Sequence, residues 1–308
     1  MRYGVHLPLI SFDGEPHSLA RLTAFADTAR RLGYSAVSVN DHFLFPRPWL
    51  DGPSALAAVL GHTEGMTLAT TVCVPAIRGP IAVAKTLGAI DVLSGGRLTV
   101  GVGPGSSQRD YDAVGIPFEE RWKRLDESVL ALRALWGRDG APFKGRFYST
   151  EGITLEPRPA QDGGPPIWIG SWGSEAGLKR TARLADGWLA SAYNTTPPVF
   201  ATAWQRLKEL LPERGKDPDT FPNALATMWL YIDDDRASTE RVFRDILCPM
   251  LNRPEEELRE KLLVGPAEAC REKLTAYRDA GLQGVFLWPV KDELRQLERF
   301  MERVALPQ

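Results

Sequence analysis

The sequence predicts a (β/α)8 barrel, the TIM-barrel fold, with insertions at the C-terminal face of the barrel. Extended and helical patterns alternate along the whole 308-residue chain, and eight such pairs can be counted. Eight parallel strands close this kind of barrel, which takes about 250 residues. We therefore expect residues 1–308 to form a single barrel domain with some excursions from the repeating pattern.

Eight short apolar segments are the predicted strands. Continuous apolar runs of this length are typical of strands that are buried on both faces, as in a parallel sheet. They lie at residues 3–7, 36–39, 66–72, 98–102, 167–169, 188–190, 224–232 and 285–287.

Helical periodicity follows the strands. In the first predicted helix, residues 19–32, apolar side chains recur at helical spacing at Leu22, Phe25 and Ala29, and Gly33 ends the pattern. Further helices are predicted at residues 54–60, 80–93, 119–136, 175–185, 199–211 and 293–304, and helical sequence broken at Pro249, Pro254 and Pro266 extends to residue 280.

Two segments depart from the repeating pattern. Residues 138–165 are rich in glycine and proline, and residues 233–265 separate the last two predicted strands. Both are longer than ordinary connections in a compact domain. We expect them to be excursions on the barrel, and to shape the substrate site together with the loops at residues 44–53 and 104–118.

The composition is that of an ordinary globular protein. The chain has 44% hydrophobic and 25% charged residues and a formal net charge of -2, which indicates neither a nucleic-acid nor a membrane partner. Cys73, Cys248 and Cys270 lack the spacing of a metal site, so we expect no metal. Because no signal-peptide pattern or long apolar run is found, we expect a cytoplasmic protein that acts on a small molecule.

Glycines on alternate positions end the fourth predicted strand, in the run "TVGVGPG". A Rossmann fingerprint would need a third glycine at position 106 or 108, and the helix would have to begin in the same turn. Those positions are Ser106 and Gln108, and the next predicted helix begins only at residue 119, after a loop. The missing side chains would let a flat ring approach the strand, although a crowded barrel interior also explains them.

The fifth predicted strand leads into a second candidate site, "IWIGSWGS", which runs directly into a helix. The free amides at a helix start bind anions, and the hydroxyls of Ser171 and Ser174 would add to them. An ordinary serine cap is the alternative. Barrel enzymes often bind phosphate at loops of this kind.

Polar residues also follow the second and first strands. Asp41 and His42 come directly after the second strand, where side chains point into the barrel mouth. Histidine can share a proton near neutral pH, so His42 is a catalytic candidate, and a packing histidine is the alternative. His6, at the end of the first strand, is a second candidate for the pocket.

Three blocks of the sequence resemble the luciferase-like monooxygenase superfamily. They are "VNDHF", "AKTLGAIDVLSGGRLTVGVGPG" and "PPIWIGSWGSEAGLKRTARLADGW", and the match covers most of residues 1–193. Members of that family bind flavin mononucleotide (FMN) or the deazaflavin coenzyme F420 at the C-terminal face of a (β/α)8 barrel. The Asp-His pair is more similar to the F420-dependent branch, because the flavin enzymes more often have Glu-His.

The resemblance also implies roles for individual residues. It places a cis peptide bond between Thr71 and Val72, behind the cofactor ring. The remaining cofactor residues that it implies are Gly103 and Gly105 at the ring edge, Gly170, Ser171 and Gly173 at the phosphate, and Ser191 and Tyr193 in the same pocket. Pro46 and Ser106 stand where the sugar-phosphate dehydrogenases of the family have Trp and Glu, which argues against glucose 6-phosphate as the substrate.

The leading hypothesis is an F420-dependent oxidoreductase that transfers a hydride between the deazaflavin and a small organic substrate, with Asp41 and His42 as catalytic residues. One alternative is an FMN-dependent monooxygenase that uses oxygen and receives reduced flavin from a separate reductase. Another is a cofactor-binding protein without turnover. A hydrolase with paired carboxylates fits poorly, because only Asp41 and Asp233–Asp235 are acidic at the strand ends. By analogy with the family, the chain could form a homodimer.

Overall fold

The computed structural model describes residues 1–12 and 14–306, so residues 13, 307 and 308 of the predicted 1–308 domain lie outside the described residues. All eight predicted strands are present, together with a short additional one. They are β1 (Arg2–His6), β2 (Ala36–Val39), β3 (Thr67–Cys73), β4 (Leu98–Val102), β5 (Ile167–Ser171), β6 (Gly187–Ser191), β7 (Asn223–Ile232), β8 (Leu263–Gly265) and β9 (Gly284–Pro289).

The strands close into a barrel of parallel strands. Strands β1 to β7 pair in sequence order, β9 pairs with β7, and β9 also pairs with β1, which closes the ring. The additional strand β8 lies outside this ring and pairs only with the last three residues of β7. The predicted (β/α)8 fold class is therefore confirmed.

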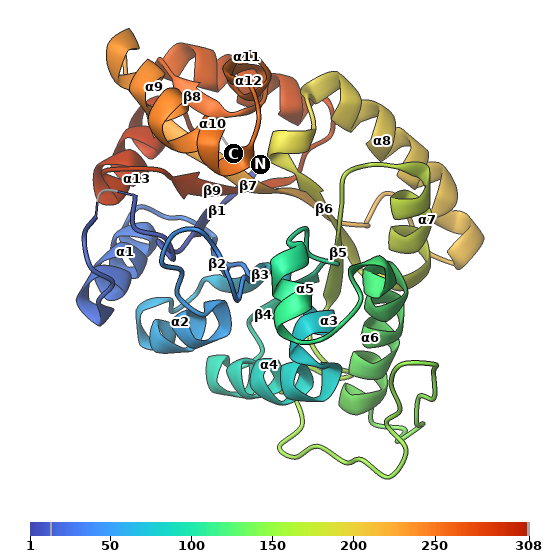
Figure 1. The fold of residues 1–308 in the computed structure, drawn as a ribbon. Coiled ribbons are helices and arrows are strands. Elements are labelled where there is room, and N and C mark those ends of the chain that lie inside the picture. Colours follow the sequence, from blue (N-terminus) through green and yellow to red (C-terminus); the bar gives the residue numbers. More distant parts are fainter. Residues whose placement is uncertain (13, 307–308) are drawn as a thin grey trace.

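Most of the helices surround the barrel as an outer layer (Figure 1). The helices of the described residues are α1 (Leu19–Arg31), α2 (Gly52–Ala58), α3 (Pro75–Arg78), α4 (Pro80–Ser94), α5 (Gln108–Ala113), α6 (Arg121–Trp136), α7 (Glu175–Leu184), α8 (Pro197–Leu210), α9 (Arg236–Val242), α10 (Cys248–Leu251), α11 (Glu255–Lys261), α12 (Ala267–Asp279) and α13 (Glu293–Arg303).

Local signals in the sequence fix several helix ends. Ser18 caps α1, because its side chain accepts a hydrogen bond from the backbone N–H of Arg21. At the other end of a helix, Gly95 follows α4 in the left-handed conformation that glycine adopts most easily. These caps define where α1 begins and where α4 ends.

The expectation of a continuous loop before residue 119 is wrong in part, since this segment contains α5. Ser107 is the N-cap of α5, and its Oγ accepts a hydrogen bond from the N–H of Asp110 at 3.3 Å. A six-residue helix is too short to show a clear apolar periodicity. Only the Ser-x-x-Asp pattern at its start indicates it.

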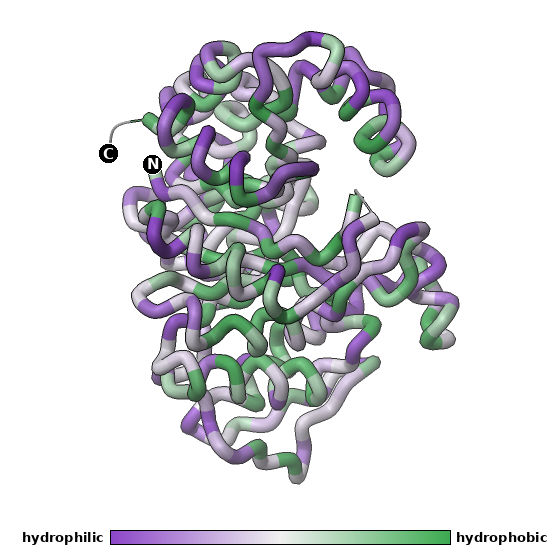
Figure 2. The backbone as a smooth tube through the Cα atoms, turned by 90° about the vertical axis from the view of Figure 1, so that its left-hand side faces the viewer, coloured by the Kyte–Doolittle hydropathy of each residue, from purple (hydrophilic) through white to green (hydrophobic). Residues whose placement is uncertain are grey.

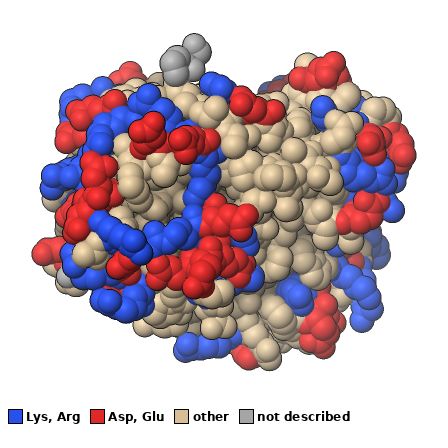
Figure 3. All heavy atoms as spheres, turned by 90° about the horizontal axis from the view of Figure 1, so that it is seen from above, with Lys and Arg blue, Asp and Glu red and all other residues tan. Residues whose placement is uncertain are grey.

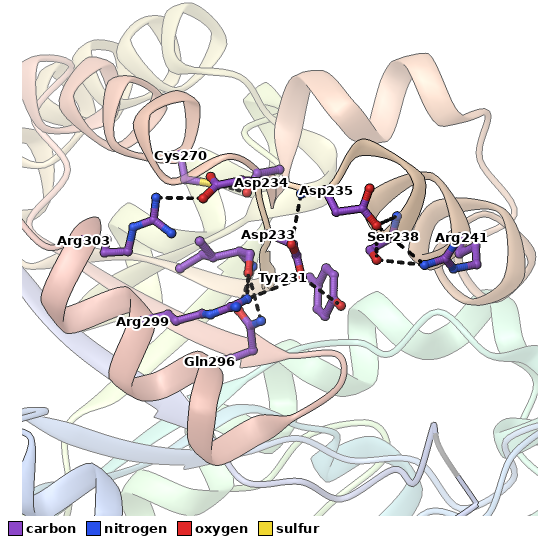
Figure 4. A network of polar contacts seen from close by, with 12 residues as sticks. Tyr231, Asp233, Asp234, Asp235, Ser238, Arg241, Cys270, Gln296, Arg299 and Arg303 are labelled. Atoms are coloured by element: carbon purple, nitrogen blue, oxygen red, sulfur yellow. Dashed lines mark hydrogen bonds and ion pairs between the residues drawn. The ribbon is translucent and has the colours of Figure 1, made fainter.

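Residues 233–265 form an excursion at the C-terminal face, with α9, α10, α11 and β8. Close to β7, Asp233 pairs with Arg299 and Asp234 pairs with Arg303, both on α13, as Figure 4 shows. Asp235 accepts hydrogen bonds from the first turn of α9. The three acidic residues considered for a hydrolase therefore have structural partners, and none of them lines the cavity described below.

Residues 138–165 pack along the outside of α6. They connect α6 to β5, and the backbone N–H groups of Arg146 and Phe147 donate to the carboxylate of Glu127 in α6. Figure 1 shows this segment at the edge of the molecule. Of the four segments expected to shape the substrate site, only residues 104–118 contribute to the lining of the cavity at the barrel mouth; residues 44–53, 138–165 and 233–265 do not.

The main core lies between the barrel strands and the outer helices. Apolar positions, green in Figure 2, are concentrated in the middle of the molecule, and hydrophilic positions are frequent in the outer segments. On the face shown in Figure 3, basic and acidic side chains are interspersed beside a broad uncharged area. Across the described part of the chain, no helix has the length and apolar character needed to cross a bilayer.

Candidate active site

A cavity of ≈ 330 Å³ opens at the C-terminal ends of the barrel strands. Residues from six consecutive strands or the loops that follow them, β2 to β7, form its walls. This volume is at the lower end of the range of small-molecule sites, about 300–1,000 Å³. In TIM barrels, the C-terminal face is where active sites lie.

A second, smaller cavity of ≈ 120 Å³ lies toward the N-terminal ends of the strands and is lined by residues such as Arg2, Thr67 and Thr99. Thr71 and Leu189 line both cavities and separate them. Because the larger cavity contains the titratable and helix-start groups, we regard it as the candidate active site.

Ten of the twelve predicted site residues line the larger cavity. They are Asp41, His42, Thr71, Val72, Gly103, Gly105, Gly170, Ser171, Ser191 and Tyr193. His6 and Gly173 do not line it. The fold thus brings together residues that are up to 152 positions apart in the sequence, from Asp41 to Tyr193.

Strand β3 carries an irregularity at the cavity. The peptide bond between Thr71 and Val72 is cis, as the resemblance implied, and the register between β3 and β4 shifts between Thr70 and Cys73. Val72 lies over two glycines: a Cβ on Gly103 would be 2.7 Å from Val72 Cγ2, and one on Gly170 would be 3.0 Å from Val72 Cγ1.

The glycines at the ends of β4 and β5 therefore serve two different purposes. At Gly103 and Gly170, the missing side chains make room for Val72, so a flat ligand would meet the Val72 side chain and not bare strands. At Gly101, a Cβ would overlap the carbonyl oxygen of Thr70 and the side chain of Leu189. Gly101 thus serves the packing of the barrel interior, which was the alternative explanation.

His42 is held by a carboxylate on α5. Its Nδ1–H donates to Asp110 Oδ2 at 3.0 Å, and the other oxygen, Oδ1, accepts the backbone N–H of Leu44 at 2.7 Å. The Asp110 side chain is 5% exposed and that of His42 is 20% exposed. With Nδ1 engaged, Nε2 is the ring nitrogen that remains for a ligand.

The carboxyl group of Asp110 is ionised over a wide pH range. Burial alone would raise its pKa, but hydrogen bonds from His42 and from the backbone of Leu44 and Phe43 outweigh burial and lower the pKa. An ionised carboxylate only accepts hydrogen bonds, which fixes the proton of His42 on Nδ1.

Asp41 has a different partner. Arg78 donates from Nε to Oδ2 at 2.7 Å and from Nη2 to Oδ1 at 2.6 Å, and the backbone N–H of Val74 also donates to Oδ2. Arg78 further contacts Asp51, the N-cap of α2. Both oxygens of Asp41 are therefore occupied in a buried ion pair that joins the loop after β2 to the end of β3.

The turn that leads into α7 lines another part of the cavity, through Ser171 and Trp172. Ser174 is the N-cap of α7, and its Oγ accepts the N–H of Gly177 at 3.3 Å, while Ser171 Oγ accepts the N–H of Gly173 at 3.3 Å. Gly173 has φ = 87°, a conformation that favours glycine. The hydroxyl protons and the remaining amides of this turn are suited to an anion.

Ser191 and Tyr193 extend the wall at the end of β6. Ser191 Oγ accepts a hydrogen bond from Asn194 Nδ2 at 2.9 Å. Burial raises the pKa of Tyr193, against the opposing effect of its hydrogen bond with Ser191. The phenol is therefore protonated at neutral pH and can donate a hydrogen bond.

His6 belongs to an aromatic stack beside the cavity. Its ring lies parallel to Trp288 with a centroid separation of 3.5 Å, and Trp288 stacks on Trp229 at 4.2 Å. Burial lowers the pKa of His6 to about 3, and its Nδ1–H donates to the carbonyl of Leu7 at 2.7 Å. His6 is thus neutral at physiological pH, and ring contacts through Trp288 and Trp49 connect it to His42.

The sequence reasoning missed several residues of the site. Asp110 holds His42, and its only signal was the Ser-x-x-Asp start of a short helix. Two further lining residues, Asn40 and Trp172, lie in the quoted blocks "VNDHF" and "IWIGSWGS" but were not assigned to the site. Other lining residues carry no motif that indicates a site. They are Phe118, Arg121, Trp122 and Thr227.

The profile of luciferase-like monooxygenases matches residues 1–284. An F420-dependent glucose-6-phosphate dehydrogenase of Nakamurella multipartita is 30% identical over 237 residues, which cover 73% of this chain and 67% of the relative. An F420-dependent hydroxymycolic acid dehydrogenase of Mycobacterium tuberculosis is 28% identical over 229 residues, which cover 71% of this chain and 61% of the relative.

Solved structures share the fold over nearly the whole chain. One is an F420-dependent secondary alcohol dehydrogenase in complex with an F420-acetone adduct, with a TM-score of 0.85 and 19% sequence identity. The alignment covers 98% of this chain and 98% of that one.

Proposed function

The chain belongs to the luciferase-like monooxygenase family, and from this premise we propose that it is an F420-dependent oxidoreductase that transfers a hydride between the deazaflavin and an alcohol or carbonyl substrate. Family membership indicates an oxidoreductase. The two dehydrogenases described above support the cofactor, because both are named F420-dependent. They also support the substrate class, because glucose 6-phosphate and hydroxymycolic acids both carry hydroxyl groups.

One observation supports the proposal: a single cavity is lined both by His42, whose Nδ1 is bound to Asp110, and by Ser171, in the turn that leads into α7. A cofactor with a redox ring and a phosphate on its side chain needs a proton-transfer group beside the ring and an anion-binding group at the phosphate. Val72 would support the ring, and Ser171 with the turn before α7 would hold the phosphate. The residues present thus fit a deazaflavin or flavin nucleotide.

When bound, F420 supplies a ring carbon, in place of flavin N5, that accepts or gives a hydride. We assign His42 the transfer of the proton that accompanies the hydride. As the C–H hydride leaves an alcohol, Nε2 of His42 takes the hydroxyl proton, and the substrate becomes a carbonyl compound. Asp110 keeps Nδ1 protonated and stabilises the imidazolium that forms.

We assign Asp41 a positioning role in this reaction. Both of its oxygens bind Arg78, and the ion pair ties the loop after β2 to α3. Proton transfer through Asp41 would require breaking a buried ion pair, which is strongly unfavourable. Asp41 therefore keeps His42 in place through the backbone it anchors.

An FMN-dependent monooxygenase is the second candidate, favoured by the description of the family. FMN also has a tricyclic ring and a phosphate, so the same cavity would hold it. Such an enzyme would need reduced flavin from a separate reductase. A binding protein without turnover is the third candidate, and a proton-transfer group aimed at the cavity argues against it.

Equilibrium titration of the purified chain with F420 and with FMN, followed by turnover assays with a panel of secondary alcohols, tests the proposal. We expect tighter binding of F420, and loss of the deazaflavin absorbance when an alcohol is oxidised. Tight FMN binding without F420 binding would favour the monooxygenase. If the chain bound the cofactor but turned over no alcohol or carbonyl compound, and if His42→Ala bound the cofactor equally well, the binding protein would be favoured.

A further inference from the structure

An arginine without an ion-pair partner lines the cavity. Arg121 is the first residue of α6, and its Nη1 donates to the carbonyl of Phe118 at 3.0 Å. No carboxylate within residues 1–12 and 14–306 forms an ion pair with it. The nearby Arg78, Arg124 and Arg180 pair with Asp41, Glu120 and Asp126 respectively.

Arg121 stands at a helix start, where the helix dipole does not favour a basic side chain. The start of a helix carries a partial positive charge, so a cation there is repelled, whereas an anion is attracted. The guanidinium lies over the ring of Phe118, with its carbon 4.0 Å from the ring centroid, and 5.8 Å from the centroid of Trp122. These contacts with aromatic rings orient the guanidinium group but do not neutralise its charge.

Asp41 and His42, which also line the cavity, already have partners. Asp41 is paired with Arg78, and His42 donates to Asp110. Among the described residues that line the cavity, Arg121 is therefore the charged side chain without an ion-pair partner. A planar guanidinium with free N–H groups is the side chain best suited to bind a phosphate or a carboxylate in two-point fashion.

We propose that Arg121 is a second anion-binding point of the cavity, separate from the start of α7, and that it binds an acidic group on the side chain of the bound cofactor. This inference rests on the proposed function, because it takes the ligand to be a deazaflavin or flavin nucleotide. Two acidic groups qualify: the phosphate that FMN and F420 share, and the carboxylates that follow it in F420.

The test compares Arg121→Met with the wild-type chain in titrations with four ligands. FMN and riboflavin differ only in the phosphate, and F420 differs from its tail-free deazaflavin riboside in the phosphate and the carboxylates. The matched control is Arg109→Met, because Arg109 is an exposed arginine of α5 that does not line the cavity and whose replacement changes the net charge equally.

We expect Arg121→Met to weaken F420 binding by about 10- to 100-fold, the loss typical of a hydrogen bond to a charged group. Binding of the tail-free riboside should change little, and the difference should shrink as salt is added. A parallel loss for FMN but not riboflavin assigns the contact to the phosphate. A loss confined to F420 assigns it to the carboxylates.

Two results would overturn the inference while leaving the proposed function intact. One is an equal loss for all four ligands, since that would indicate a packing role on Phe118. The other is unchanged F420 and FMN binding by a folded Arg121→Met variant. If the wild-type chain bound neither F420 nor FMN, the proposed function would fail first and this inference with it. Arg121→Lys, which keeps the charge, should recover part of the affinity.

Discussion

At the scale of single residues, the site depends on which partner each ionisable group has. Asp41 and His42 are neighbours in the sequence, yet Asp41 pairs with Arg78 and His42 with Asp110. The sequence could indicate that His42 lies at the barrel mouth, because it follows a strand. It could not indicate Asp110 as its partner, because that contact joins residues 68 positions apart through a six-residue helix.

The first prediction concerns His42→Gln. Glutamine keeps a polar group of similar size but cannot accept and release a proton, so turnover with F420 should fall by about 10²- to 10⁴-fold, the usual contribution of an acid–base group. F420 affinity should change much less. Steady-state kinetics with an alcohol substrate, beside a cofactor titration, measure both. Turnover equal to that of the wild-type chain would remove His42 from the mechanism.

The second prediction concerns Asp110→Asn and pH. Because the pKa of Asp110 is lower in the folded chain, its ionised form stabilises the fold above its ordinary value of about 4, and this contribution is lost as pH falls through the folded-state pKa. The variant lacks the contribution at every pH. The wild-type chain should therefore be more stable than the variant at pH 7, and the difference should narrow toward pH 3.

Urea unfolding of both chains at several pH values measures this difference. Asp139→Asn is a suitable control, because Asp139 is exposed and far along the chain from the site. A stability gap between the wild-type chain and Asp110→Asn that stays constant from pH 7 to pH 3 would contradict the assigned ionisation of Asp110.

At the scale of elements, the neighbouring ends of β3, β4 and β5 build the cavity floor. Val72 fits over Gly103 and Gly170, and Gly101 lets Thr70 and Leu189 approach β4 from inside the barrel. The glycine run was visible in the sequence, but its two purposes were not, because the neighbours that require it come from β3 and β6. The helix α5 was missed because six residues carry too little helical periodicity, and β8 was missed because it lies inside the segment predicted as an excursion.

The third prediction is that Gly101→Ala destabilises the chain strongly. The added Cβ would overlap the Thr70 carbonyl oxygen, which belongs to the backbone and cannot rotate away. Overpacking of this kind costs about 1–3 kcal/mol or more. Gly61→Ala is the matched control, because a Cβ at Gly61 would meet nothing within 4 Å, and its effect should stay within about 0.5 kcal/mol. Denaturant unfolding measures both, and equal stability of the two variants would contradict the packing role of Gly101.

At the scale of the whole molecule, the alternation of strands and helices was enough to predict the barrel, because eight repeats with short connections leave few other ways to bury both faces of a parallel sheet. The position of residues 138–165 could not be predicted in this way. That segment follows a helix and packs along α6, whereas residues 233–265 follow a strand and lie at the C-terminal face. No residue of either excursion lines the cavity.

The central claim is that one cavity holds a deazaflavin with its ring between Val72 and His42 and its phosphate at the start of α7. The most direct test is a crystal structure of the chain with F420 bound. The account predicts the ring against the Val72 side chain, its hydride-bearing carbon on the side of His42 Nε2, and the phosphate at Ser171. A cofactor in the smaller cavity at the N-terminal end, or a ring whose reactive carbon faces away from His42, would contradict it.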